Sequence, residues 1–291
     1  MATVGFLAGP TYDYPAYMAQ WSQVLAGENP WLFGTANVYG VGHQILAPVF
    51  HVHPLLPKLL FIFCWLGSFV TILGARRDSP AVDLAVFLAL FATPFFIVLI
   101  CLYGVEDALV TFLALAAIDL RTRKARTIAP AILLAVAALT KVYPVALLPF
   151  LATDRARIDF RFIILFLAAM SLGILFTVAL WGAQLLHIVD VATAREGKML
   201  SIFWFLLDSR FSPLAHTPLA KLLSDWNFAV VIVAMASLYG VHFFGRMRSL
   251  AGTVLASIGL LAAYKVGNPP YFVFPATLLI YFLAVERTSD G

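Results

Sequence analysis

Long apolar runs separated by short polar connections dominate the sequence. The runs cover residues 55–74, 82–103, 107–120, 128–140, 144–152, 162–183, 227–244, 250–264 and 271–286. A helix needs roughly 20 apolar residues to cross the hydrocarbon core of a bilayer, so each run is a candidate span. Several runs are shorter than that, and among them we expect 128–140 and 144–152 to be tilted, broken at Pro144 or buried against neighbours. The pattern predicts an all-α fold, a polytopic transmembrane bundle of about nine spans in one domain, 1–291.

Composition supports this fold class. Hydrophobic residues make up 62% of the chain and charged residues 12%, and the mean hydropathy is +0.94. Soluble domains carry roughly 45–50% apolar and about 25% charged residues, so a soluble fold and a disordered chain are both excluded. Cys64 and Cys101 lie inside apolar runs and give neither a disulfide framework nor a metal-ligand spacing. The apolar start, 1–8, is too short to span and lacks the basic region of a signal peptide, so either a first helix is missing or the chain begins at the membrane surface.

Basic residues alternate between the connections. One set of connections holds 12 Lys and Arg: Arg76, Arg77, Arg121, Arg123, Lys124, Arg126, Arg155, Arg157, Arg161, Arg246, Arg248 and Arg287. The other set holds seven: Lys58, Lys141, Arg195, Lys198, Arg210, Lys221 and Lys265. Short basic loops stay in the cytoplasm, so the first set is predicted to be cytoplasmic. We read its clusters as topology determinants that meet anionic lipid, not as nucleic-acid sites.

The remaining polar segments then converge on the non-cytoplasmic face. They comprise an outer-face segment with re-entrant or interfacial helices, 1–54, the turns near 106, 141 and 265, and a long outer-face loop, 184–226. A purely structural bundle has no need for so long a loop on one face. We therefore expect the functional site there.

The first of these segments carries a family resemblance. It reads Thr-Tyr-Asp-Tyr-Pro-Ala-Tyr from position 11, Gly-Glu-Asn-Pro-Trp from 27 and Tyr-Gly-Val-Gly-His from 39. The order of acid, Tyr, Gly-x-x-Pro-aromatic turn and second Tyr resembles the GT-C superfamily of membrane glycosyltransferases, which use polyprenyl-phosphate sugars. The matching residues are Asp13, Tyr17, Gly27, Pro30, Trp31 and Tyr39. The stretches 16–20, 27–28 and 39–43 are similar to the dolichol-phosphate-mannose-dependent mannosyltransferases.

The resemblance implies that Asp13 is the catalytic base, because a sugar hydroxyl that attacks needs a proton acceptor within hydrogen-bond reach. The structural alternative is that Asp13 caps a helix beginning near Pro15. Glu28 is a candidate for orienting the acceptor, or a solvated loop carboxylate. Tyr39 and His43 are candidates for substrate contact, and the alternative for His43 is a satisfied interfacial histidine.

Glu106 and Asp107 stand where one apolar run ends and the next begins. The Gly-x-x-Asp ending at Asp107 is similar to a turn of GT-C proteins. Because burying acids at a helix junction is costly, a functional role in holding the acceptor or positioning a basic partner is one reading. The other is an acidic first turn that complements the helix dipole.

The turn Thr-Lys-Val-Tyr-Pro at 140–144 resembles the Lys-x-x-Pro turn of the same superfamily. A departing lipid phosphate accumulates negative charge, and a fixed cation there would stabilise the transition state. This makes Lys141 a candidate for phosphate binding, with Tyr143 beside it. The alternative for Lys141 is snorkelling to the interface.

Two further segments supply weaker candidates. The loop 184–226 contains Arg195 and Lys198, which are possible helpers in binding the lipid phosphate. The stiff turn Tyr-Lys-Val-Gly-Asn-Pro-Pro-Tyr at 264–271 places Lys265 and Asn268 where GT-C proteins often carry a polar residue.

The resemblance implies an inverting hexosyltransferase that moves a hexose, most simply mannose, from a polyprenyl phosphate to a lipid-linked or glycan acceptor. Its setting would be a bacterial plasma membrane or an ER-type membrane. No metal or cofactor is expected beyond the donor, and a membrane-protein partner remains open. The rival hypotheses are a lipid or solute transporter or flippase, which would place its charges near the midplane, and a non-catalytic subunit of another membrane enzyme.

Overall fold

The computed structural model describes most of the chain, with gaps. It covers residues 9–11, 13–31, 39–75, 93–154, 157–182, 202–263 and 269–286, together with residues 3, 7, 85, 88, 89 and 184. The statements below concern these residues only.

Nearly all regular structure is helical. The first half contains α2 (Tyr14–Leu25), α3 (Val41–Gln44), α4 (Ala47–Val52), α5 (Leu56–Ala75), α7 (Pro94–Phe96), the π-helix η2 (Ile97–Leu102), α8 (Asp107–Thr122) and α9 (Ile128–Thr140). The second half contains the 3₁₀ helix η3 (Tyr143–Leu147), α10 (Leu148–Ala152), α11 (Phe160–Trp181), α13 (Ile202–Leu207), α14 (Pro218–Asp225), α15 (Asn227–Phe243), α16 (Ser249–Ala263), the 3₁₀ helix η5 (Pro269–Phe272) and α17 (Val273–Glu286). Two-residue antiparallel strands, β1 (Thr153–Asp154) and β2 (Arg157–Ile158), are the exception.

Local sequence sets the limits of the longest helix, α11. The carboxylate of Asp159 accepts a hydrogen bond from the backbone N–H of Phe162 at 3.0 Å and so caps its start. At its end Gly182 adopts a φ of 75°, a left-handed conformation that glycine takes without steric cost. The 22 residues between make a helix about 33 Å long.

The number of spans differs from the sequence prediction. Within the described residues α5 and α11 are the two helices long and apolar enough to cross a membrane, and up to four cross if each of two bent pairs, α7–η2 with α8 and α14 with α15, is one span. Every predicted apolar run contains helix, but α9 has 13 residues and is about 20 Å long, short of the roughly 30 Å core. The expected nine spans are therefore not confirmed.

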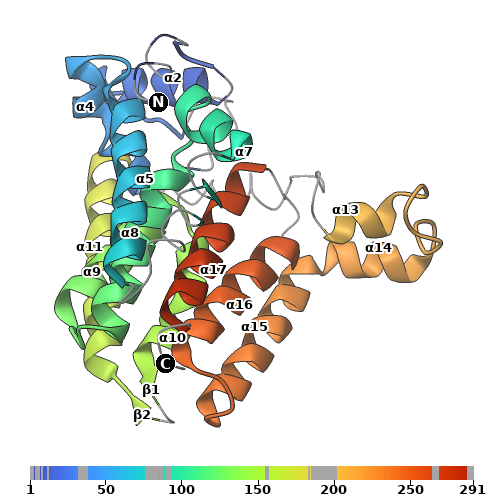
Figure 1. The fold of residues 1–291 in the computed structure, drawn as a ribbon. Coiled ribbons are helices and arrows are strands. Elements are labelled where there is room, and N and C mark those ends of the chain that lie inside the picture. The colour runs from blue at the N-terminus through green and yellow to red at the C-terminus, as the bar shows by residue number, and fades with distance from the viewer. Residues whose placement is uncertain are drawn as a thin grey trace.

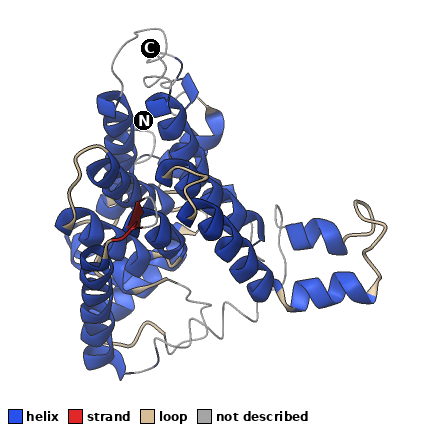
Figure 2. Cartoon of the chain, turned by 90° about the horizontal axis from the view of Figure 1, so that it is seen from below, coloured by secondary structure: helices blue, strands red, loops and turns tan. Residues whose placement is uncertain are grey.

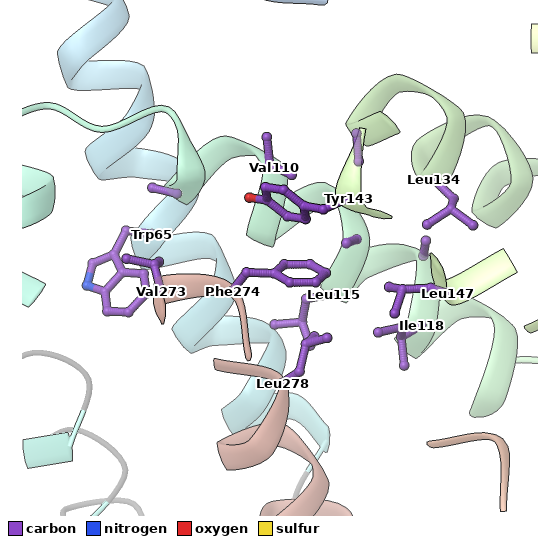
Figure 3. Close-up of a cluster of buried hydrophobic side chains, with 14 of the residues drawn as sticks. Trp65, Val110, Leu115, Ile118, Leu134, Tyr143, Leu147, Val273, Phe274 and Leu278 are labelled. Atoms are coloured by element: carbon purple, nitrogen blue, oxygen red, sulfur yellow. The ribbon is translucent and has the colours of Figure 1, made fainter. Parts of the chain in front are cut away.

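The helices form two packed groups that meet along α8, η3 and α10 (Figure 1). One group contains α5, α8, α9 and α11, and the other contains α15, α16 and α17; α8 packs against α5, α9 and α17. Figure 3 shows apolar side chains of α8, Leu115 and Ile118 among them, in one buried cluster with Trp65 of α5, Leu134 of α9 and Phe274 of α17. Alanines at positions 108, 114 and 117 are fully buried in α8, and such small residues let helices approach closely.

The two ends of this body differ in chemistry. At one end, called the basic end, Arg121 at the end of α8 pairs with Asp159 at 2.7 Å, and Arg123 pairs with Asp119 at 2.8 Å. β1 and β2 lie at this end in Figure 1. At the other end, called the aromatic end, α2 and α4 lie across the ends of the longer helices. The predicted site residues that the structure describes belong to the aromatic end.

Candidate functional site

Four stretches of chain meet at the aromatic end: α2, the segment 39–44 with α3, the start of α8 and the turn after α9. They bring seven of the predicted residues into contact or electrostatic reach of one another: Asp13, Tyr39, His43, Glu106, Asp107, Lys141 and Tyr143. Arg195, Lys198, Lys265 and Asn268 lie outside the described residues.

The turn that starts α8 fixes the two acids. The chain bends by 109° between η2 and α8, and Gly104 in the turn has a φ of 65°. A Cβ at Gly104 would meet side-chain carbons of Lys58 and Tyr14, so only glycine fits there. Glu106 and Asp107 follow, and both are fully buried. Glu106 does not cap α8 through its side chain, while Asp107 lies in the first helical turn, where the helix dipole favours a negative charge.

Asp107 is bonded through both oxygens. Its Oδ2 lies 2.7 Å from Nζ of Lys141, and its Oδ1 accepts a hydrogen bond from the hydroxyl of Tyr143 at 2.9 Å. The side chain of Asp107 is 1% exposed and that of Lys141 is 10% exposed. Burial alone would lower the pKa of Lys141, but Asp107, Tyr271, Tyr39 and Glu106 outweigh it and raise the pKa above its ordinary value. Lys141 is therefore a fixed cation at neutral pH.

Glu106 bonds to a different partner, His43 of α3. Nδ1 of His43 lies 2.9 Å from Oε1 of Glu106, and both side chains are completely buried. Within the described residues the second atoms of the pair, Nε2 of His43 and Oε2 of Glu106, have no hydrogen-bond partner. Buried polar atoms are nearly always satisfied by protein, water or a ligand. This pair therefore retains one donor or acceptor site on each member.

Aromatic rings join the two pairs. The imidazole of His43 is stacked between Trp21, at 4.9 Å, and Tyr39, at 4.8 Å. The ammonium of Lys141 lies 5.5 Å from the ring of Tyr39 and 5.2 Å from that of Tyr271, within the range of cation–π attraction. Tyr39 therefore contacts both His43 and Lys141.

Close backbone approach explains the glycines around His43. The backbone N–H of Gly40 donates to the carbonyl of Thr140 at 3.2 Å. A Cβ at Gly40 would overlap the carbonyl oxygen of Leu139, and a Cβ at Gly42 would overlap Oγ1 of Thr140. The Tyr-Gly-x-Gly-His stretch is thus required for α3 to rest on the end of α9 and to place Tyr39 beside Lys141.

Asp13 lies at the edge of this cluster. It precedes α2 and forms no side-chain cap hydrogen bond to it, so the capping alternative does not account for its side chain. The segment is held by Thr11, whose hydroxyl donates to the carbonyl of Leu102 at 2.6 Å. Burial raises the pKa of Tyr39 above its ordinary value. The positive charge of Lys141 lowers this pKa, and the negative charge of Asp13 raises it. Asp13 and Lys141 therefore both lie within electrostatic reach of one phenol.

Glu28 takes no visible part in the cluster. Its side chain is exposed, and its backbone N–H donates to the carbonyl of Gln23 at 2.9 Å. The solvated-loop alternative fits this position.

Three residues at this end, Trp21, Lys58 and Tyr271, were not singled out from the sequence. Tyr14, Tyr17 and Trp21 recur at helical spacing on the buried face of α2, a signal that could have identified Trp21. Tyr271 lies beside Lys141 only because η5 and the turn after α9 meet in space. Lys58 is buried and donates to the carbonyls of Gly9, at 2.8 Å, and Leu102, at 2.7 Å, so it ties the segment before Asp13 to η2.

Two other features bear on ligands. No group of three His, Cys, Asp or Glu side chains that could hold a metal ion occurs within the part of the chain described. A surface hollow of about 410 Å³ lies elsewhere, lined by Leu207, Ala215, His216, Thr217, Pro218 and Lys221.

Comparison with other proteins does not place the chain in a family. No family model, no curated protein and no solved structure matches it.

Proposed function

We propose that this protein is a membrane glycosyltransferase that moves a hexose, most simply mannose, from a polyprenyl phosphate to a lipid-linked or glycan acceptor. The reaction would take place at the non-cytoplasmic face. The observation that carries the proposal is the buried ionic cluster at the aromatic end, in which Asp107–Lys141 and His43–Glu106 are joined by Tyr39 beside Asp13. The resemblance of its motifs to GT-C enzymes supports the same activity.

A membrane setting accounts for the surface of the helices. On α11 large apolar side chains, among them Ile164, Leu172 and Leu175, are more than 60% exposed. Monomeric soluble proteins rarely expose continuous apolar surface of this kind, whereas lipid accommodates it. A lipid-carried donor would then reach the site by moving laterally within the leaflet.

The proposed reaction is a single displacement. An acceptor hydroxyl attacks the anomeric carbon of the donor, the new C–O bond forms as the bond to the phosphate oxygen breaks, and the configuration at that carbon inverts. The hydroxyl proton passes to the carboxylate of Asp13, and the polyprenyl phosphate leaves with the electron pair of the broken bond. A positioned base contributes about 10²–10⁴-fold to such a step.

The buried pairs would act on the leaving group and the acceptor. Lys141 is held by Asp107 and by two aromatic rings before any substrate arrives. A cation that needs no reorganisation stabilises developing negative charge well. Asp107 and Tyr143 are then positioning residues for Lys141, and the unsatisfied atoms of His43 and Glu106 would hydrogen-bond sugar hydroxyls.

The placement of charge favours transfer over transport. In the described helices the buried ion pairs lie at helix ends: Asp107 begins α8, Lys141 follows α9, and Asp119 lies in the last turns of α8. Transporters usually place such groups near the bilayer midplane. A path of ionisable groups across the described helices is not evident.

A donor panel tests the proposal. The native protein in lipid nanodiscs is incubated with polyprenyl-phosphate mannose, glucose and galactose, together with lipid-linked oligosaccharides as acceptors, and the products are analysed by mass spectrometry. We expect one donor to be consumed, with release of polyprenyl phosphate and with inverted configuration in the product. If no donor is consumed, the enzymatic proposal is wrong, and movement of the labelled donor between leaflets of proteoliposomes would support a flippase instead.

A further inference from the structure

A helical hairpin projects from the body of the protein. Helices α13 and α14 pack against each other and extend sideways from the N-terminal end of α15 (Figure 1), and the view from below shows the same projection (Figure 2). The chain bends by 72° between α14 and α15. The hairpin is therefore set almost at a right angle to the helix that follows it.

Helix α14 has three distinct sides. At 100° per residue, Leu219, Leu222 and Trp226 fall on one side, and all three are exposed. Lys221 and Asp225 fall on a second side and are also exposed. The third side carries Ala220 and Ser224, which are buried. The helix thus keeps an apolar side and a charged side uncovered at once.

Large apolar side chains are also exposed in the segments on either side of α14. Phe211 in the connection from α13 is 56% exposed, Trp226 is 64% exposed and Phe228 in the first turn of α15 is 74% exposed. Large apolar side chains gathered on one side of an otherwise polar helix are typical of helices that lie in a membrane interface. Tryptophan is enriched at that level of the bilayer.

The direction of α15 sets the plane of the hairpin. The 17 apolar-rich residues of α15 make a helix about 26 Å long, and its C-terminal end reaches the basic end, where His242 bonds to the carbonyl of Thr153 at 3.1 Å. If α15 runs along the bilayer normal, a helix bent by 72° from it lies within 18° of the membrane plane. Helix α14 then lies at the surface of the leaflet that is opposite the basic end.

We propose that the α13–α14 hairpin is a lipid-binding surface, in which Leu219, Leu222 and Trp226 insert at the boundary between headgroups and acyl chains while Lys221 and Asp225 face the headgroups and water. The partner is the leaflet at the aromatic end, because α14 leads directly into the end of α15 that lies away from the basic end. The inference rests on α15 crossing the bilayer by itself, with α14 at the membrane surface and not part of the same span. It does not rest on glycosyl transfer, so it holds for an enzyme or a transporter.

Site-directed labelling tests this placement. Single cysteines are introduced as Leu222→Cys and, as the matched control, Lys221→Cys, since both positions are exposed, adjacent and on different sides of α14. Cys64 and Cys101 are buried, and background labelling is measured on the native protein. Each variant is spin-labelled in nanodiscs of mixed neutral and anionic lipid, and its collisions with oxygen and with a water-soluble nickel complex are compared by electron paramagnetic resonance.

The collision ratios distinguish lipid, water and a second protein chain as the surroundings of position 222. We expect the ratio of oxygen to nickel collisions to be several-fold higher at position 222 than at 221. Equal access of nickel to both positions would overturn the proposal, because the hairpin would then stand in water. Protection of position 222 from both reagents, with an immobilised spectrum, would also overturn it, because a second copy of the chain would then cover that side.

Discussion

The ammonium of Lys141 lies 2.7 Å from the carboxylate of Asp107, although 34 residues separate them in the chain. The pair is buried, so its attraction is offset by the cost of removing both charges from water. Such a pair is weak support for stability as such, but breaking it leaves an uncompensated charge. This asymmetry gives the first prediction.

Replacing Lys141 by methionine should destabilise the protein by about 3–5 kcal/mol, because Asp107 is left buried without its cation. The double variant Lys141→Met with Asp107→Asn should lose less than the single variant, since no isolated charge remains. The measurement is the free energy of unfolding, obtained by titrating a denaturing detergent into the protein in micelles of a mild detergent. If the double variant is less stable than Lys141→Met, the two residues do not act as a charge pair.

Glu106→Gln should slow transfer by about 10–10²-fold, because a hydrogen bond to a charged group contributes about 1.5–3 kcal/mol. The amide keeps the size of the side chain but removes the charge that orients the imidazole of His43 at 2.9 Å. The readout is kcat/KM with the donor found in the panel. Asp208→Asn is the control, because Asp208 pairs with Arg210 on the α13–α14 connection, away from the cluster. Equal rates for both variants would remove Glu106 from the mechanism.

Gly42→Ala should cost about 1–3 kcal/mol through overpacking, since the new Cβ would overlap Thr140. It should also slow transfer, because α3 carries His43. The matched control is Gly240→Ala in α15, where a Cβ meets nothing within 4 Å and helix propensity predicts a gain of about 0.5–1 kcal/mol. The thermal unfolding midpoints of the two variants and of the native protein show whether the close approach of α3 to α9 requires glycine at position 42. Equal midpoints would show that α3 and α9 do not need this close approach.

The sequence predicted the helices better than the spans. Apolar periodicity and length mark a run such as 162–183, and α11 occupies Phe160–Trp181. The same signal does not distinguish a lipid-exposed crossing from a short helix buried against neighbours, as α9 shows with Leu134 and Ala135 fully buried. Span number depends on packing and bending, which hydropathy does not contain.

Local motifs likewise indicated several residues of the buried cluster but not which of them pair with one another. Acids at a helix junction and a lysine in a Pro-containing turn indicated Glu106, Asp107 and Lys141. Which acid pairs with which partner depends on how α3 packs on the end of α9. This is a tertiary contact between segments far apart in the chain, made for example by the hydrogen bond from Gly40 to Thr140. Tyr271 enters the cluster through the same kind of contact. The turn 264–271 is a candidate segment in the sequence, but its pattern does not show that Tyr271 lies beside Lys141.

The most direct test of the proposed activity is the transfer rate of Asp13→Asn under single-turnover conditions, with the native protein and Asp208→Asn measured in parallel. The substitution is nearly isosteric and keeps the backbone carbonyl of Asp13, which accepts hydrogen bonds from Ala16 and Tyr17. The thermal unfolding midpoint of each variant is measured beside its rate, so that loss of the fold is distinguished from loss of the base. We predict that the transfer rate falls by about 10²–10⁴-fold, the contribution of a general base, while Asp208→Asn keeps the native rate. An Asp13→Asn protein that transfers the sugar at the native rate would contradict the account.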